Sequence, residues 1–194
     1  YGYKIIEMEI TILKRLTHRG AVGSDPDTGD GAGILLSLPD EFFRLVLPNK
    51  LPARGKYGVA MMFGGCGHEE ELEAAVTENG GSVIAWRQVP VDRDSIGKNA
   101  QRTCPLIRQL FIDGSGFADQ AEFERKLFVM RREMERRVEG CYVCSCSSRS
   151  IVYKGLFLGT QIEGFYGDLA SEHFKSPLAL VHQRYSTNTF PTWS

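Results

Sequence analysis

The chain has 194 residues, of which 42% are hydrophobic and 24% charged, and its formal net charge is −1. This composition is typical of a globular domain and excludes a disordered chain. The near-zero net charge does not favour a nucleic-acid surface, and no apolar run reaches the roughly 18 residues that a membrane span needs. We therefore expect neither nucleic acid nor membrane as a partner. The five cysteines show no disulfide framework, and the first residues show no secretory signal, so reduced thiols in an intracellular protein are expected.

The predicted elements follow from hydrophobic periodicity. Apolar residues at near-helical spacing predict a helix over 3–17, and short apolar runs predict strands over 33–38, 57–63, 82–89, 106–112 and 177–184. Further helices are expected over 41–45, 68–79 and 119–138, the last with an inner side made by Ala121, Phe123, Leu127, Met130 and Met134. Residues 142–147 and 151–154 predict a β-hairpin, and 90–105 is expected to be a long connection. Because the alternation is too irregular for a parallel sheet, we expect antiparallel sheets covered by helices.

Residues 17–34 form the most distinctive segment, with five glycines, three aspartates and one proline. Glycine and proline disfavour a helix or a central strand, so this segment predicts an ordered loop whose backbone closely approaches another group. Arg19 stands at its entrance, where it can meet a negative charge. The aspartates resemble a calcium loop, but Leu36 occupies the position of the bidentate glutamate. We therefore expect the aspartates to cap turns.

A second arginine marks the end of the last predicted strand. Arg184 follows the apolar run 178–181 and precedes Tyr185, Ser186 and Thr187. A planar guanidinium beside hydroxyl groups suits a small zwitterion such as an amino acid, and a structural ion pair at a strand end is the alternative. His182 is either a pocket residue or a satisfied core histidine.

Two other features favour structural roles. Cys141, Cys144 and Cys146 have the spacing of a metal cluster, but strand alternation puts Cys144 and Cys146 on one face and Cys141 on the other. With no fourth ligand nearby, we expect core thiols and no metal. The basic residues of helix 119–138 interleave with glutamates, which indicates a solvated face with ion pairs one turn apart.

Three long segments carry a resemblance to a known family: residues 17–34, 147–155 and 182–193. They closely resemble the glutaminase domain of the glutamate synthases, which is a class II glutamine amidotransferase and an N-terminal-nucleophile hydrolase. Residues 86–90 and 105–109 fall in matching places, so the resemblance covers essentially the whole chain. It implies an α+β, four-layer α/β/β/α sandwich of two antiparallel sheets. It also implies hydrolysis of L-glutamine to glutamate and ammonia, which a synthase domain of the same polypeptide or complex adds to 2-oxoglutarate.

The resemblance also implies roles for particular residues. Arg184 would bind the α-carboxylate of glutamine, and Thr187 would help to hold the same end of the substrate. Tyr185 and Ser186 would line the pocket, and Arg19 would order the site. The family nucleophile is an N-terminal cysteine whose own α-amine serves as the base, since its pKa of about 7.7–8.0 lies near working pH.

That cysteine is not among the 194 residues, so we expect it on a strand upstream of Tyr1. Beyond Ser194 we expect the oxyanion-hole Asn-Gly pair and an acidic residue that binds the α-amine of the substrate. Residues 1–194 are thus expected to be one amidotransferase domain lacking its first strand and its C-terminal part, and to be inactive alone. The alternatives are a degenerate domain with a binding role and a sister amidotransferase acting on another acceptor. No cofactor is expected in this domain, whereas FMN and an iron–sulfur cluster are expected in other domains. The expected compartment is the cytoplasm, or a plastid in a eukaryote.

Overall fold

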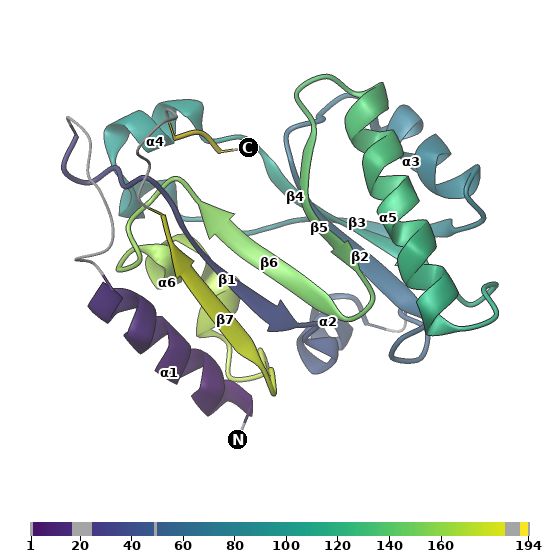
Figure 1. The fold of residues 1–194 in the computed structure, drawn as a ribbon, viewed down its shortest axis with the longest axis horizontal. Coiled ribbons are helices and arrows are strands. Elements are labelled where there is room, and N and C mark those ends of the chain that lie inside the picture. Colours follow the sequence, from purple (N-terminus) through teal and green to yellow (C-terminus); the bar gives the residue numbers. More distant parts are fainter. Residues whose placement is uncertain (1, 17–24, 49, 185–190, 194) are drawn as a thin grey trace. The chain divides into compact units, whose positions relative to one another are not determined.

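The computed structural model describes residues 2–16, 25–48, 50–184 and 191–193. They form two compact units. The first comprises residues up to Phe42, with Val89–Pro105 and Val152–Trp193, and the second comprises Phe43–Gln88 and Leu106–Ile151. One sheet has three strands and the other has four, so the fold is α+β with two antiparallel sheets, as expected (Figure 1).

In chain order the elements are α1 (Gly2–Arg15), β1 (Ala32–Ser37), α2 (Asp40–Val46), β2 (Tyr57–Phe63), α3 (Glu69–Thr77), β3 (Ser82–Gln88), η2 (Arg93–Ser95), α4 (Lys98–Thr103), β4 (Ile107–Asp113), α5 (Gln120–Arg137), β5 (Tyr142–Ser147), β6 (Ser150–Gly155), α6 (Ile162–Phe165), η3 (Gly167–Ala170) and β7 (Ala179–Gln183). Among the helices of the described residues, none is long and apolar enough to span a membrane.

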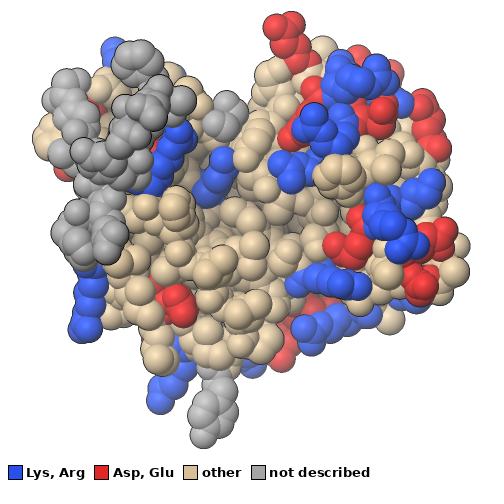
Figure 2. Space-filling view, in the orientation of Figure 1, with Lys and Arg blue, Asp and Glu red and all other residues tan. Residues whose placement is uncertain are grey.

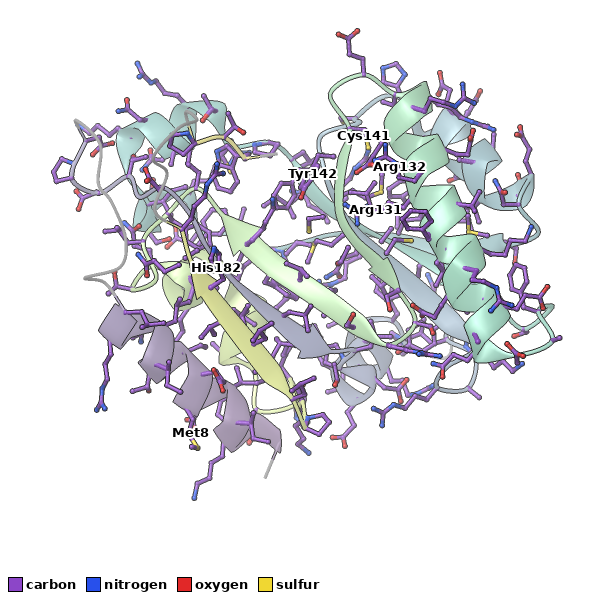
Figure 3. All side chains as sticks on the ribbon, viewed as in Figure 1. Met8, Arg131, Arg132, Cys141, Tyr142 and His182 are labelled. Carbon is purple, nitrogen blue, oxygen red and sulfur yellow. The ribbon has the colours of Figure 1, made fainter. Side chains whose placement is uncertain are left out.

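The sheet of the first unit has the order β6-β1-β7. Alternate residues of its central strand, Ala32, Ile34 and Leu36, are buried, so one face of the sheet packs into a core and the other is more open. Helix α1 lies beside β7 and buries one face at helical spacing, made by Ile6, Ile10 and Leu13. Met8 is 63% exposed on α1 and points away from the sheet (Figure 3).

Aromatic rings fill the core of this unit. Tyr153 of β6 packs edge-on against Tyr166 and Phe174, with ring centroids 4.9 and 5.5 Å away. Its hydroxyl donates a 2.9 Å hydrogen bond to the buried carboxylate of Asp168. The Tyr166 hydroxyl in turn donates to the carbonyl oxygen of Lys154 at 2.7 Å. These bonds satisfy the polar atoms that the rings bring inside and fix the position of β6.

The sheet of the second unit has the order β3-β4-β2-β5. All seven residues of β2 are buried, and its ends agree with the predicted strand 57–63. Helices α3 and α5 cover one face of the sheet (Figure 1). Their core contains Leu72, Val76, Leu127, Met130, Met134, Leu110 and Ile112. Each large side chain buried here contributes about 1.5–3 kcal/mol relative to its exposed state.

Arg108 of β4 anchors the turn before α3. Its guanidinium lies 4.6 Å from the centre of the Trp86 ring, and Nη2 donates to the Gly65 carbonyl at 2.7 Å. Nη1 forms an ion pair with Glu69, and this hydrogen bond lowers the pKa of Glu69. The segments 86–90 and 105–109 thus contribute a cation–π contact and a loop anchor within the second unit.

The charged face predicted for α5 is confirmed. Asp119 caps the helix by accepting from the Glu122 amide at 2.7 Å. Glu133 and Glu135 form ion pairs one turn away with Arg131, Arg132, Arg136 and Arg137. Figure 2 shows acidic and basic side chains interleaved on the surface in the region of α5. Ala121 is exposed, so its predicted place on the inner side is wrong, whereas Phe123, Leu127, Met130 and Met134 are buried.

The predicted β-hairpin over 142–154 is wrong. The strands β5 and β6 form as expected, but β5 pairs with β2 in one sheet and β6 lies next to β1 in the other. The turn between them is held by Glu124 of α5, which accepts 2.6 Å hydrogen bonds from both the amide and the hydroxyl of Ser148. Hydrogen bonds to the Glu124 side chain therefore hold this turn, whereas in a hairpin the hydrogen bonds between the two strands would hold it.

Three further expectations need correction. The connection 90–105 contains the helix α4 and the short turn η2. The last strand, expected to be buried over 177–184, is only Ala179–Gln183, and of its five residues only Gln183 is buried, with Leu180 64% exposed. The segment 17–34 was expected to exclude a central strand, yet its last three residues, Ala32–Ile34, begin β1, which is the central strand of its sheet.

Candidate functional site

The candidate site is a groove on the open face of the three-stranded sheet. In the β1–β7 register Gly33 pairs with His182 and Leu35 with Leu180, so these residues share the face opposite the core. On the other side of β1, a Cβ added to Gly33 would lie 2.9 Å from the Cβ of Lys154 in β6. Across the sheet, therefore, Lys154 and His182 flank a position with no side chain.

A second glycine of the groove, Gly31, lies opposite Arg184, two residues along the strands from the Gly33–His182 pair. The amide of Arg184 donates a 2.8 Å hydrogen bond to the carbonyl of Gly31, which continues the β1–β7 register. Gly31 has φ +127°, a conformation that side-chain-bearing residues rarely adopt. A Cβ at this position would lie 4.0 Å from the Cβ of Arg184. Gly31 and Gly33 thus make a floor of bare backbone.

The groove encloses a cavity of about 300 Å³. This volume lies at the lower end of the range for small-molecule sites. One end is apolar, with Leu35, Leu180 and Val152, and the other is charged. Its full lining is Asp30, Gly31, Ala32, Gly33, Ile34, Leu35, Val152, Lys154, Gly155, Leu180, His182, Arg184, Thr192 and Trp193. A small molecule with a polar head and an aliphatic body fits this lining.

Trp193 forms a wall at the charged end. Its Nε1 donates to the Ala100 carbonyl of α4 at 3.3 Å, and its ring packs 5.7 Å from Phe165. Gly155 makes room for this ring, because a Cβ there would lie 2.8 Å from Trp193 Cζ3. Close packing against α4 and α6 therefore positions the wall.

The aspartate-rich loop beside the groove is fixed to α4. The Asp25 carboxylate accepts from the Thr28 hydroxyl at 2.8 Å and from the Asn99 amide at 3.1 Å. Both hydrogen bonds lower the pKa of Asp25, and the bond from the Asn99 amide has the larger effect. The Gly97 amide donates to the Asp27 carbonyl at 3.0 Å. The expectation that these aspartates cap turns is confirmed for Asp25, which caps the start of α4.

The structure describes one of the five residues to which the sequence gave a role in the site. Arg184 is half-buried and lines the cavity, and its expected binding of the α-carboxylate stays a prediction. Arg19, Tyr185, Ser186 and Thr187 lie outside the described residues, so their expected roles stay predictions. His182 is exposed and lines the cavity, which favours the pocket alternative over the core one.

Sequence reasoning missed two charged residues of the cavity. Asp30 is only 9% exposed and lines the charged end, although the sequence suggested only a capping role for it. Lys154 had no assigned role. The alternation of β6, in which Ile151, Tyr153 and Gly155 are buried and Lys154 is not, was a signal that Lys154 faces the open side of the sheet.

The cysteines lie apart from this groove, in and beside β5. The expectation that Cys141 points away from Cys146 is wrong, because both contact the core under α3 and α5. A register shift between Met61 and Met62 inserts one extra residue into β5 and reverses the alternation. Burial raises the pKa of Cys141 to about 11 and that of Cys146 to about 12. The expectation of core thiols is confirmed for Cys141, whereas Cys144 and Cys146 are only partly buried. In the described residues no group of three or more potential ligands could hold a metal ion.

Comparison with known proteins gives the class. The chain belongs to the class-II glutamine amidotransferases, since the family model matches residues 1–194. Within that class it is similar to glutamate synthases. It is 46% identical to the "Glutamate synthase [NADPH] large chain" of Bacillus subtilis over 98% of this chain and 13% of that protein. It is 37% identical to the "Glutamate synthase [NADH]" of Saccharomyces cerevisiae over 99% of this chain and 10% of that protein. It is 35% identical to the chloroplastic ferredoxin-dependent enzyme of Oryza sativa over 99% of this chain. The chain thus spans about an eighth of the length of most of these relatives.

Proposed function

We propose that this chain is the glutamine-hydrolysing part of a glutamate synthase. It would hydrolyse L-glutamine to glutamate and ammonia, and a synthase part would add the ammonia to 2-oxoglutarate. The observation that carries the proposal is Arg184, a cation at the charged end of an amino-acid-sized cavity in a chain of the amidotransferase family.

The groove supplies what recognition of glutamine needs. The Arg184 guanidinium would bind the α-carboxylate through two parallel hydrogen bonds. Asp30 adds a carboxylate at the same end, and the acidic residue that would bind the α-ammonium is expected beyond Ser194. The aliphatic part of the substrate would lie over the glycine floor. Tyr185, Ser186 and Thr187 directly follow Arg184 in the sequence and would complete the pocket.

The covalent step needs a group outside the 194 residues. In the proposed reaction the thiol of an N-terminal cysteine, expected upstream of Tyr1, gives its proton to the α-amine and attacks the side-chain amide carbon. The C–N bond breaks, ammonia leaves with that proton, and water cleaves the resulting glutamyl thioester to glutamate and the free thiol. The five cysteines of this chain lie within it and carry no α-amine. A protein made only of residues 1–194 is therefore expected to release no glutamate. Arg19 would order the site around the incoming cysteine.

The rest of the proposal concerns the whole protein. Its relatives are named for NADPH, NADH or ferredoxin, so the electron donor differs among them. FMN and an iron–sulfur cluster would belong to other domains. We propose a cytoplasmic location, or a plastid one in a eukaryote, because some relatives are named as chloroplastic. Excluding water from the ammonia route would keep the ammonia unprotonated.

The test compares Arg184→Met with the matched variant Arg102→Met in the full-length protein. Arg102 is exposed on α4 and bonds to Asn99 of the same helix. Loss of a hydrogen-bonded charge pair costs about 1.5–3 kcal/mol, so Arg184→Met should raise the KM for glutamine about 10- to 150-fold. Arg102→Met should leave the KM within twofold.

Three results would contradict the proposal. The first is a wild-type full-length protein that releases no ammonia from glutamine, which would favour the degenerate, binding-only alternative. The second is an equal effect of the two arginine variants. The third is turnover with an acceptor other than 2-oxoglutarate, which would favour a sister amidotransferase.

A further inference from the structure

The described lining of the groove contains a second cation besides Arg184. Among the described lining residues, Arg184 and Lys154 are cations and Asp30 is the one carboxylate, a formal net charge of +1 when histidine is not counted. Glutamine is a zwitterion with no net charge, so one cation and one carboxylate match its two charged groups. Lys154 has no counterpart on that substrate.

The geometry puts Lys154 at a distance from Arg184 that one small ligand can span. Lys154 is on β6 and Arg184 is on β7, with β1 between them. Two strand spacings separate the outer backbones by roughly 10 Å. Gly33 next to Lys154 and Gly31 next to Arg184 place no side chain in the intervening space. Two long cationic side chains can therefore approach opposite ends of a ligand lying across β1.

A ligand that matches both cations carries a carboxylate at each end. L-glutamate, the product of the proposed reaction, differs from glutamine by having a carboxylate where the substrate has a neutral amide. Its net charge of −1 complements the formal +1 of the described lining residues. An ammonium and a carboxylate attract each other as two full charges, and a neutral amide lacks this attraction, so an ammonium at this end distinguishes product from substrate.

We propose that Lys154 is a specificity residue that binds the side-chain carboxylate of L-glutamate, so that the site retains its product and glutamate inhibits glutamine hydrolysis. This inference rests on the proposed function. His182, which faces Lys154 across Gly33, adds a second polar wall to the same end of the ligand.

The experiment uses the full-length protein and follows ammonia release, because added glutamate would mask a glutamate assay. The variants are Lys154→Met, which removes the charge at similar length, and Lys154→Arg, which keeps it. Lys14→Met is the matched control, because Lys14 pairs with Glu163 on an exposed surface, with Nζ 2.7 Å from its carboxylate. The measured quantities are the inhibition constant of L-glutamate and the KM of L-glutamine. Calorimetric titration with L-glutamate measures binding without turnover.

Lys154→Met should raise the inhibition constant and the calorimetric dissociation constant of glutamate at least fivefold more than it raises the KM. Lys154→Arg should keep the wild-type ratio within about twofold, as should Lys14→Met. A merely structural role of Lys154 would change both constants by the same factor, and that result overturns the inference, as does an arginine variant that loses as much as the methionine variant. If the wild-type protein hydrolyses glutamine, and Lys154→Met leaves the ratio of the glutamate inhibition constant to the glutamine KM unchanged, this inference alone is refuted. A wild-type protein that does not hydrolyse glutamine refutes the proposed function and this inference together.

Discussion

Gly33→Ala tests whether the floor of the groove requires bare backbone. The added Cβ would lie 2.9 Å from the Cβ of Lys154 and 3.1 Å from the carbonyl oxygen of Tyr153. Neither atom is the free end of a flexible side chain, so β6 would have to move away from β1. Overpacking of this kind costs about 1–3 kcal/mol of unfolding free energy. In a chain of this size that corresponds to about 2–4 °C of melting temperature for each kcal/mol.

The assay is urea denaturation followed by tryptophan fluorescence, in a Trp86→Phe background. The chain has two tryptophans, and this substitution leaves Trp193, which forms a wall of the same groove. Gly116→Ala is the matched control, because a Cβ at Gly116 would meet nothing within 4 Å. An alanine in open space is expected to be neutral or to stabilise by about 0.4–1 kcal/mol, through lower entropy of the unfolded chain.

Equal unfolding free energies for Gly33→Ala and Gly116→Ala would refute the packing argument. A loss of stability in Gly33→Ala, with no rise in the KM for glutamine when the same substitution is made in the full-length protein, would leave the packing argument intact but contradict the groove as the substrate site. The structure predicts that both quantities change, because the new methyl group would also project into the cavity.

Three further predictions concern groups around the groove and in the second unit. Tyr153→Phe removes the donor to the buried Asp168 carboxylate and should cost about 1–3 kcal/mol in a denaturation experiment, and an unchanged midpoint would contradict that role. The hydrogen bonds that lower the pKa of Asp25 stabilise its charged form, so their contribution is complete above its unfolded value near 3.8 and is lost as pH falls through the lower folded value. The stability difference between wild type and Asp25→Asn, measured by urea midpoints, should therefore be constant from pH 7 to 5 and shrink toward pH 3, and a difference independent of pH would contradict it. Iodoacetamide at pH 8 should label the exposed Cys66 in the native protein and spare Cys146, whose pKa burial raises to about 12, as peptide mass spectrometry can show.

Elements that depend on local pattern could be predicted from the sequence. The strand over 57–63 was predicted to the residue, because an apolar run bounded by turn residues indicates a buried strand whatever its neighbours are. Helix α5 was predicted within one residue at each end, and Asp119 caps it from the predicted first position. Both features require information only from nearby residues.

Elements that depend on distant partners could not be predicted. Helix α4 has six mostly polar residues and no apolar period, and its first turn is capped by Asp25 from 74 residues earlier in the chain. The strands β5 and β6 have hairpin-like spacing, but Glu124 holds the turn between them and leaves each free to join a different sheet. In each case the element depends on a contact with the side chain of a residue distant in sequence, which no local pattern reveals.

The same distinction explains which part of the candidate site was found. Arg184 could be assigned from the sequence, because its strand and the residues after it are contiguous. Lys154 became a candidate only once β6 and β7 were known to flank β1, since its distance from Arg184 is set by strand order. Strand order between segments about 30 residues apart is a tertiary property, and a lysine in an alternating strand is by itself most often a solvated residue.

Two different physical reasons exclude a side chain at the glycines before and within β1. Gly29, Gly31 and Gly33 recur at every second position, so they face one side of an extended chain. A Cβ at Gly29 or Gly33 would collide with the chain's own segment 153–158, so these two glycines permit close packing of neighbouring backbone. The Cβ of Gly31 would meet nothing closer than 3.4 Å, and what excludes a side chain there is its φ of +127°. Substitution at Gly29 or Gly33 should therefore act first on folding. Gly31, whose carbonyl holds the Arg184 amide, is the position where a substitution changes the direction of the backbone beside the ligand.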